Sequence, residues 1–451
     1  MRELKDIQNI YFVGVGGIGM SALARYVKLL GKTVFGYDKT PTKLTNELIN
    51  EGIDITFIDA VSEIDLTFIT PANTLVIYTP AIPENNQILR FFNAENYTVI
   101  KRAKFLGEVT KNTLCLAVAG THGKTTTSAI LGHILAECNM PVTAFLGGIA
   151  ENYNSNFISR GTEITVVEAD EFDRSFLHLS PDIACITSMD ADHLDIYGDT
   201  VSIEKSFVEF TALIPKKENL LVKKGLPLEG KSVAVNESAD YEAQNVRIEN
   251  GSYVFDLKTP SELIKDLQFS LPGHHNLYNA VTALGMAISA GTPTPCLPKA
   301  LLSFRGVQRR FSYKIKLDDL VLIDDYAHHP TEIDALFQAV SELYPNDGKL
   351  IVFQPHLYSR TKDFADGFAE SLSRFDEVLL LDIYAAREEP INGVTSNWLC
   401  DKISAKSKKV ISKIMLPESV QKSRCKIKLM VGAGDICTEV DKVTKFVRDE
   451  R

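Results

Sequence analysis

The chain has 451 residues, 45% of them hydrophobic and 24% charged. This is an ordinary globular composition, and it excludes a disordered, collagen-like or coiled-coil protein. The net charge of −10 gives no electrostatic argument for binding nucleic acid or an anionic membrane, so we expect neither as a partner. A small anionic substrate remains compatible with this charge, because a local site can be positive. At ~150 residues per domain, the length predicts about three domains.

The seven cysteines are widely spaced, and none belongs to a C-x-x-C pair. Several lie in apolar runs such as LCLAVAG and DIACITS, which is typical of buried, reduced thiols in a cytosolic protein. The N-terminus lacks the apolar core and cleavage site of a signal peptide. No apolar run reaches the ~18 residues that a membrane span requires. We therefore expect a cytoplasmic protein with reduced cysteines.

Three stretches of the chain each start a new alternation of strand and helix patterns, which is typical of a mostly parallel sheet covered by helices. In the first, apolar runs predict strands at 9–15, 33–38 and 74–82. In the second, they predict strands at 114–120, 164–170 and 182–188, a polar hairpin-like region at about 216–270, and a helix at 275–288. In the third, they predict strands at 320–330, 349–355, 377–384 and 426–435. We predict an α/β protein with domains at 1–107, 108–311 and 312–451.

A glycine cluster follows the first predicted strand. Its sequence, from Gly14 to Gly19, fits G-x-G-x-x-G between a strand and a helix. Glycines there let the backbone approach a pyrophosphate, and the helix N-terminus favours negative charge. Asp38 ends the next strand, where a ribose-binding acid would stand. The pattern favours a nucleotide diphosphate, NAD or another, over a purely structural turn.

A second glycine loop follows the strand at 114–120. It reads Gly120-Thr121-His122-Gly123-Lys124-Thr125-Thr126. In such a loop backbone N–H groups surround the phosphates, the lysine reaches the β- and γ-phosphates, and the threonine hydroxyl ligates Mg²⁺. The strict pattern has a further glycine where Val118 stands, so the match is partial. We still favour an ATP loop over a structural turn.

Acidic residues end the next predicted strands of the same domain. Glu168-Ala169-Asp170-Glu171 closes one strand, and Asp190-Ala191-Asp192-His193 follows another. Carboxylates at this edge of a sheet, beside a phosphate loop, are where Mg²⁺ is held. A lone histidine is usually structural, but the position of His193 favours a metal or phosphate role. Zinc is disfavoured, because no cysteine or second histidine stands at ligand spacing.

Two further sites precede the third domain. Asn276 and Asn279 are three residues apart at the start of a helix, so both can face one side, although helix N-capping by Asn276 is an alternative. Arg309 and Arg310 stand at the domain break, where arginines either reach phosphates or only form salt bridges. The residues alone leave both alternatives open.

In the third domain, polar residues follow two strands. DDYAHHP contains Asp325, Tyr326, His328 and His329, and QPHLYSR contains His356 and Arg360. Open α/β sheets bind ligands at the carboxyl ends of their strands. Together these side chains are suited to recognise a carboxylate and an amino group.

Taken in order, the motifs GTHGKTT, EAD–E, DADHLDIYGD, HHNLYNA, RRF, DDYAHHPTEI and QPHLYSRT resemble the Mur ligase family, the ATP-dependent amide ligases of peptidoglycan synthesis. The resemblance covers essentially the whole chain. It implies a Rossmann-like N-terminal domain that holds the UDP of the substrate, a central P-loop ATPase-like domain, and a C-terminal Rossmann-like domain that brings in the amino acid and closes over the site.

The resemblance also implies the chemistry. The γ-phosphate of ATP activates a substrate carboxylate as an acyl phosphate, and an amine then displaces phosphate. The start YFVGVGGIGMSALA, with DDYAHHPTEI and QPHLYSRT, is most similar to the branch that joins L-alanine to UDP-N-acetylmuramate. The implied cofactors are ATP and two Mg²⁺ ions, with Mn²⁺ as a substitute. The expected oligomeric state is a monomer or weak homodimer.

Residue roles carry over from the family by position. Lys124, Glu168, His193 and Arg310 are implied as catalytic residues, and Thr125, Glu168 and His193 as the metal ligands. The ATP site would comprise Gly120, Thr121, His122, Gly123, Lys124, Thr125, Thr126, Asn276, Asn279, Arg310 and Asp325. The UDP group would lie at Gly16, Gly17, Ile18, Asp38 and Thr79, and the muramoyl and alanine end at Tyr326, His328, His329, His356 and Arg360.

Two positions depart from the family. Relatives commonly carry arginine where this chain has Leu357, which affects the amino-acid pocket. Other branches carry a carbamylated lysine where this chain has Phe207, and its absence agrees with the alanine-adding branch. The alternatives are a recycling ligase that adds an intact L-Ala-γ-D-Glu-diaminopimelate tripeptide, an NAD-dependent oxidoreductase, and a non-catalytic ATP-dependent switch.

Overall fold

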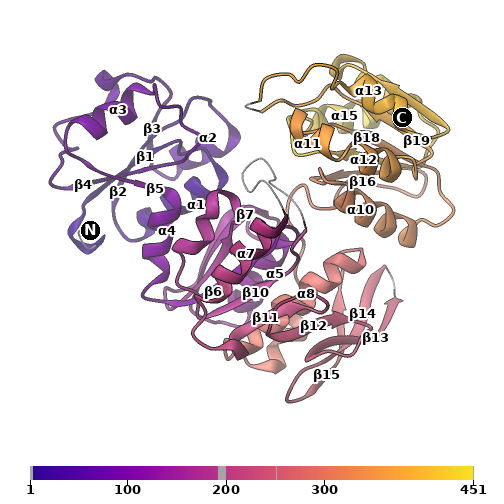
Figure 1. Ribbon diagram of the computed structural model, residues 1–451, viewed down its shortest axis with the longest axis horizontal. Coiled ribbons are helices and arrows are strands. Elements are labelled where there is room, and N and C mark those ends of the chain that lie inside the picture. Colours follow the sequence, from indigo (N-terminus) through magenta and orange to yellow (C-terminus); the bar gives the residue numbers. More distant parts are fainter. Residues whose placement is uncertain (1–3, 191–199, 250, 387, 450–451) are drawn as a thin grey trace. The chain divides into compact units, whose positions relative to one another are not determined.

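The computed structural model describes residues 4–190, 200–249, 251–386 and 388–449, and these form three β-sheets with helices on their faces (Figure 1). Every strand predicted from an apolar run is present, so the α/β class is confirmed. The chain divides into two compact units. The first contains Met1–Glu242, Lys258–Ile264 and Ala280–Ser303, and the second contains Ala243–Leu257, Lys265–Asn279 and Phe304–Arg451. The domain boundaries after residues 107 and 311 stay predictions.

The first sheet is parallel and has the strand order β3-β2-β1-β4-β5. Its strands are β1 (Asn9–Val13), β2 (Thr33–Tyr37), β3 (Asp54–Thr56), β4 (Thr74–Tyr78) and β5 (Thr98–Lys101). Its helical elements are η1 (Leu4–Asp6), α1 (Ile18–Leu29), α2 (Lys43–Asn50), η2 (Val61–Glu63), α3 (Gln87–Ala94) and α4 (Arg102–Thr110). The strand order reverses at β1, so the glycine loop that follows this strand lies where such sheets bind nucleotides.

The second sheet has ten strands in the order β15-β14-β13-β12-β11-β10-β6-β9-β7-β8. They are β6 (Leu114–Ala119), β7 (Val142–Ala150), β8 (Ser155–Ser159), β9 (Ile164–Ala169), β10 (Ile183–Ile186), β11 (Leu220–Lys223), β12 (Lys231–Val235), β13 (Tyr241–Glu249), β14 (Ser252–Lys258) and β15 (Leu263–Phe269). The associated helical elements are α5 (Lys124–Glu137), η3 (Phe172–His178), α7 (Thr200–Thr211), η4 (Lys217–Asn219), α8 (His274–Ser289), η5 (Thr294–Cys296) and α9 (Leu297–Leu302). β6 pairs in parallel with β10 and β9, which brings the carboxyl ends of the three strands to one edge.

The third sheet has the order β16-β17-β21-β18-β19-β20, and only the pairing of β16 with β17 is antiparallel among these strands. The strands are β16 (Ser312–Lys316), β17 (Val321–Asp325), β18 (Lys349–Phe353), β19 (Glu377–Leu380), β20 (Ser407–Val410) and β21 (Ile427–Val431). The helical elements are α10 (Pro330–Leu343), α11 (Tyr358–Asp363), α12 (Ala365–Leu372), α13 (Ser396–Lys402), η6 (Lys413–Met415), α14 (Leu416–Lys422) and α15 (Cys437–Asp449).

Helix α1 of the first sheet packs against β7 and β8 of the second, within the first compact unit. The rings of Tyr26 and Phe145 meet edge to face with centroids 5.3 Å apart. Arg25 is buried and its guanidinium donates to the side chains of Asn156 and Glu51. A buried arginine needs such acceptors to offset its loss of hydration. The Tyr26–Phe145 and Arg25–Asn156 contacts attach the first sheet region to the second.

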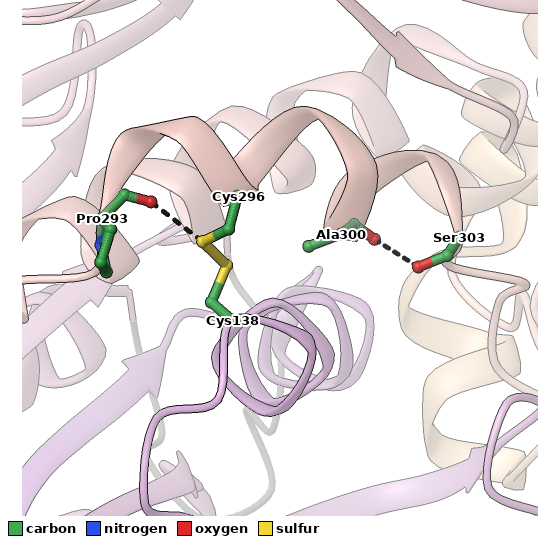
Figure 2. The surroundings of a disulfide bond; sticks show 5 residues. All are labelled: Cys138, Pro293, Cys296, Ala300 and Ser303. Atoms are coloured by element: carbon green, nitrogen blue, oxygen red, sulfur yellow. Dashed lines mark hydrogen bonds between the residues drawn. A yellow bond between two sulfur atoms is a disulfide. The ribbon is translucent and has the colours of Figure 1, made fainter.

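The prediction that all seven cysteines are reduced is wrong for one pair. Cys138, directly after α5, and Cys296, at the end of η5, form a disulfide with a Cα–Cα distance of 5.6 Å (Figure 2). The other five cysteines are free, and four of them are buried as expected. Wide spacing along the sequence concealed the pair, because packing of α5 against α9 brings residues that are 158 positions apart into contact.

Candidate active site

The phosphate loop joins the end of β6 to the start of α5, as its sequence predicts. Gly120 has φ +131° and Gly123, the residue before α5, has φ +85°. A Cβ atom on Gly120 would stand 2.1 Å from the hydroxyl oxygen of Thr187, so no larger residue fits there. The hydroxyls of Thr121 and Ser188 are 2.8 Å apart and tie the loop to the end of β10. These contacts fix the loop against the segment after β10, at the N-terminus of α5, where an anion is favoured.

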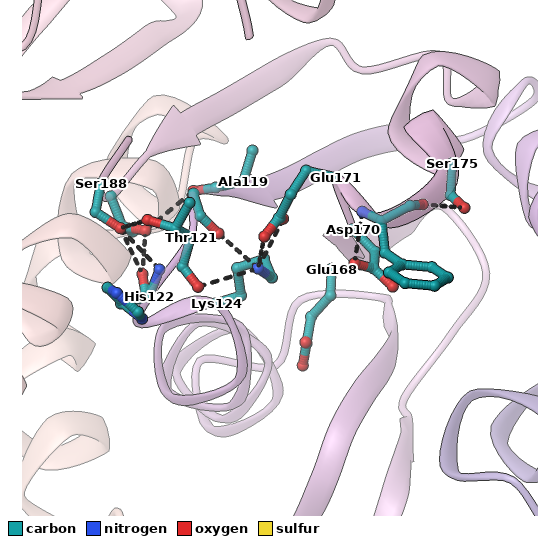
Figure 3. A network of polar contacts seen from close by, with 12 residues as sticks. Ala119, Thr121, His122, Lys124, Glu168, Asp170, Glu171, Ser175 and Ser188 are labelled. Carbon is teal, nitrogen blue, oxygen red and sulfur yellow. Dashed lines mark hydrogen bonds and ion pairs between the residues drawn. The ribbon is translucent and has the colours of Figure 1, made fainter. Parts of the chain in front are cut away.

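Lys124 is the first residue of α5, and its ammonium points to main-chain and carboxylate oxygens (Figure 3). It donates to the carbonyls of Gly120 at 2.6 Å and Thr121 at 3.3 Å. It also donates to both carboxylate oxygens of Glu171, at 2.9 and 2.7 Å. Burial opposes the charge of Lys124, but Glu171 and the neighbouring acids outweigh it and raise the pKa of the ammonium. The lysine is therefore charged and suited to a phosphate.

Glu168, at the end of β9, lies beside the first turn of α5. Its carboxylate accepts from the hydroxyls of Thr125 and Ser128, each at 3.1 Å, and from the N–H of Gly147 at 2.5 Å. Burial raises the pKa of Glu168, although these donors act against the rise. The hydroxyl of Thr125 and the carboxylate of Glu168 are the oxygen ligands that Mg²⁺ prefers. The third predicted ligand, His193, lies outside the described residues.

The residues predicted to hold the UDP group are brought together after β1. The N–H of Gly16 donates to the carboxylate of Asp38 at 2.8 Å. A Cβ on Gly14 would stand 2.6 Å from the side chain of Thr79. Gly17 precedes the first residue of α1, which is Ile18. The five predicted residues thus lie in or against one loop at the N-terminus of α1, a position that favours a diphosphate.

Arg102 is a candidate that the sequence reasoning missed. Its guanidinium lies against Gly19, in the first turn of α1, and 3.7 Å from the carboxylate of Asp170. Arg102 therefore adds a positive charge beside the glycine loop after β1, where we predict that the UDP group binds. The signal available was a basic residue directly after a strand of the same parallel sheet, in the sequence KRAKFLG.

In the second unit, the predicted arginines meet Tyr326. The guanidinium carbons of Arg309 and Arg310 lie 4.8 and 5.0 Å from the centre of its ring. Asp325 accepts from the backbone N–H groups of Phe311 and Ala327, at 2.7 and 2.8 Å. Burial raises the pKa of Asp325 despite these donors. Asp325 thus anchors the backbone beside Arg310, and its contact with the ATP ribose stays a prediction.

His328 and His356 also come together in the second unit, with ring centres 6.2 Å apart. The His356 ring stacks on Tyr384, a residue that the sequence analysis did not select, and its Nδ1 lies 3.2 Å from the guanidinium of Arg360. Leu357, between them in sequence, has φ +68° and ψ 138°, a conformation that strains any residue with a side chain. Strain of this kind often occurs at functional sites. The role of this segment at the amino-acid end stays a prediction.

Other predicted residues have structural contacts. His329 caps the N-terminus of α10 by accepting from the N–H of Thr331, and its ring packs on Phe364. Asn276 is the third residue of α8, so the N-cap alternative is wrong, and its amide donates to the carbonyl of Pro272 at 2.7 Å. Asn279 is buried in the same helix. Their contacts with substrates stay predictions.

A mostly parallel sheet with a glycine phosphate loop, a charged lysine and a threonine–glutamate pair is typical of α/β enzymes that bind a nucleoside triphosphate. Comparison with known proteins gives the family. Residues 9–113 match the model described as Mur ligase family, catalytic domain; residues 118–287 match the Mur ligase middle domain; residues 309–437 match the Mur ligase, glutamate ligase domain. The chain belongs to the Mur ligase family, which is ATP-dependent.

Curated relatives agree along the whole length. A UDP-N-acetylmuramate–L-alanine ligase of Flavobacterium johnsoniae is 58% identical over 447 residues, covering 99% of both chains. One of Christiangramia forsetii is 59% identical over 451 residues, covering 100% of both. The crystal structure of UDP-N-acetylmuramate-alanine ligase from Thermotoga maritima is 27% identical, with a TM-score of 0.82 over 98% of this chain and 100% of that one. Among the described residues, no helix is both long and apolar enough to cross a membrane.

Proposed function

We propose that this chain is an ATP-dependent ligase that joins L-alanine to the carboxylate of UDP-N-acetylmuramate, giving UDP-N-acetylmuramoyl-L-alanine, ADP and phosphate. The observation that carries the proposal is the constellation of Lys124, Thr125 and Glu168, at the ends of two adjacent parallel strands. Full-length similarity to curated L-alanine ligases supports the choice of substrates. The reaction belongs to peptidoglycan precursor synthesis.

The phosphate loop suits ATP because Gly120 leaves no room for a side chain and because the loop leads into the N-terminus of α5. Bound ATP supplies the phosphoryl group that turns a carboxylate oxygen into a leaving group. In the proposal Lys124 neutralises the γ-phosphate, and Thr125 and Glu168 hold Mg²⁺. Glu168 and His193 would hold a second Mg²⁺, and Mn²⁺ would substitute for Mg²⁺. Arg310 would contribute further positive charge. This work is positioning and charge neutralisation.

The two remaining groups of residues bind the substrates. The loop of Gly16 and Gly17, with Asp38 and Arg102, would hold the UDP, which explains the first glycine cluster without NAD. His328, His356 and Arg360 would bind the muramoyl and alanine end. The protein would act in the cytoplasm as a monomer or weak homodimer, on small molecules rather than on nucleic acid or a membrane.

Phosphate release tests the proposal. Purified protein is given ATP, Mg²⁺ and UDP-N-acetylmuramate, with L-alanine, with L-alanyl-γ-D-glutamyl-diaminopimelate, or with no acceptor. We expect release with L-alanine alone. Release only with the tripeptide would reassign the chain to tripeptide recycling, and release with neither acceptor would refute the proposed substrates. NADH formation without ATP would indicate an oxidoreductase instead.

A further inference from the structure

Glu171 is a buried acid in the phosphate site that the proposed reaction does not use. It directly follows the acidic end of β9 and precedes the first residue of η3, and it is 1% exposed. Both of its carboxylate oxygens accept from the ammonium of Lys124 (Figure 3). The other buried acid of this site, Glu168, instead accepts hydrogen bonds from hydroxyls and a backbone N–H group. The two acids therefore serve different partners in one site.

The ammonium of Lys124 has three hydrogens, and four protein oxygens lie within 3.3 Å of it. A phosphate oxygen can reach this nitrogen only if one of these acceptors gives up its hydrogen bond. Among these acceptors only the carboxylate of Glu171 is negatively charged. Repulsion between this carboxylate and a phosphate would therefore favour loss of the Glu171 hydrogen bonds. The side chain of the next residue, Phe172, is 36% exposed. The backbone that carries Glu171 therefore lies close to the protein surface.

We propose that Glu171 is a positioning residue that holds the Lys124 side chain in the nucleotide-free protein and competes with the γ-phosphate for its ammonium. The inference rests on the proposed function, because it requires ATP to bind at this loop. Nucleotide binding then includes transfer of the ammonium from a carboxylate to a phosphate, and Glu171 sets how tightly the triphosphate is held.

Equilibrium titration with a non-hydrolysable analogue tests this. The probe is adenosine 5′-(β,γ-imido)triphosphate with Mg²⁺, measured by calorimetry. Since charge-assisted hydrogen bonds are among the strong ones, we expect Glu171→Gln to lower the Kd about tenfold. The matched control is Asp170→Asn, which removes one charge from the same strand end, where Asp170 lies 3.7 Å from Arg102. The control should change the Kd less than threefold, as expected of a charge that acts only through space. An unchanged or raised Kd for Glu171→Gln would overturn the inference.

A second background shows whether Glu171 acts through the lysine. In Lys124→Gln, the further change Glu171→Gln should lower the Kd less than threefold, because no ammonium remains to compete for and only the through-space repulsion is lost. If it lowers the Kd equally in both backgrounds, Glu171 acts by direct repulsion and the inference fails. The double variant removes both charges of the pair, so we expect it to avoid an uncompensated buried charge and to fold. Thermal unfolding of each nucleotide-free variant checks this.

Kinetics separate positioning from a general structural defect. In Glu171→Gln the KM for ATP should fall by a factor similar to the Kd, while the KM for L-alanine is unchanged. Parallel changes in both KM values would indicate a structural defect and contradict the inference. If the wild-type protein does not bind the analogue at all, the proposed function itself is wrong. If it binds and Glu171→Gln has no effect, only this inference is wrong.

Discussion

Replacing Cys138 by serine removes a cross-link between the phosphate-loop helix and the segment around α9. The half-cystines are separated by 158 residues. In the chain-entropy description, closing a loop of that length stabilises the folded protein by about 5 kcal/mol at 25 °C, as an upper value. If the cooperative unit is the first compact unit or the whole chain, this corresponds to a fall in Tm of about 5 to 9 °C.

The assay is thermal unfolding of oxidised protein with and without a phosphine reductant. We expect the wild-type Tm to fall on reduction, and the Cys138→Ser Tm to be low in both buffers. Cys437→Ser is the matched control, because Cys437 is free and only partly buried, and its Tm should follow the wild type. Alkylation of the oxidised, denatured protein should label five thiols, and seven after reduction. Seven labelled thiols before reduction, or a Tm that ignores the reductant, would refute the reasoning.

Four further outcomes are expected. Lys124→Ala should lose at least about 3 kcal/mol of transition-state stabilisation in the ligation assay, because a preorganised charge at the phosphate is removed; near wild-type turnover would contradict this role. His193→Ala should raise the Mg²⁺ concentration required for half-maximal phosphate release, and an unaltered Mg²⁺ titration would count against metal ligation. Burial raises the pKa of Asp324 to about 6, so its ionisation weakens folding as pH rises from the unfolded value near 4 through 6. Asp324→Asn should therefore be more stable by up to about 3 kcal/mol above pH 6 and lose this advantage below pH 4 in urea unfolding, whereas a difference independent of pH would argue against the shift. Leu357→Gly should raise stability by about 1 kcal/mol through relief of the positive φ, and a lower Tm would show that side-chain packing outweighs the strain.

The strands were predictable because the buried strands of a parallel sheet are short apolar runs that end in polar or glycine residues. The run at 114–120 is β6, and the glycines that follow it form the loop that its sequence predicts. The polar region at about 216–270 was recognised as hairpin-like but without its individual strands, which are β11 to β15. Of these strands, β13 and β15 mix exposed and buried residues along their length, so their apolar signal is weaker.

The candidate site was partly predictable for a related reason. Residues that follow neighbouring parallel strands must lie at one edge of the sheet, so the sequence predicts that Lys124 and Glu168 lie close together. Glu171 stood in the same motif without a role, because no spacing rule tells which acid of a run accepts from a lysine. The contact of Arg102 with Gly19 joins separate elements, and no local pattern contains it.

By itself the sequence determined the α/β class, the strand positions, the two glycine loops and the resemblance to the Mur ligases, because these depend on local patterns of apolar, glycine and charged residues. Only the tertiary structure decided that Cys138 pairs with Cys296, that His329 caps a helix, and that Glu171 holds Lys124. Each of these depends on a distance of a few ångströms between side chains on different elements. Such distances are set by how the elements pack, and a periodicity along the chain does not encode them.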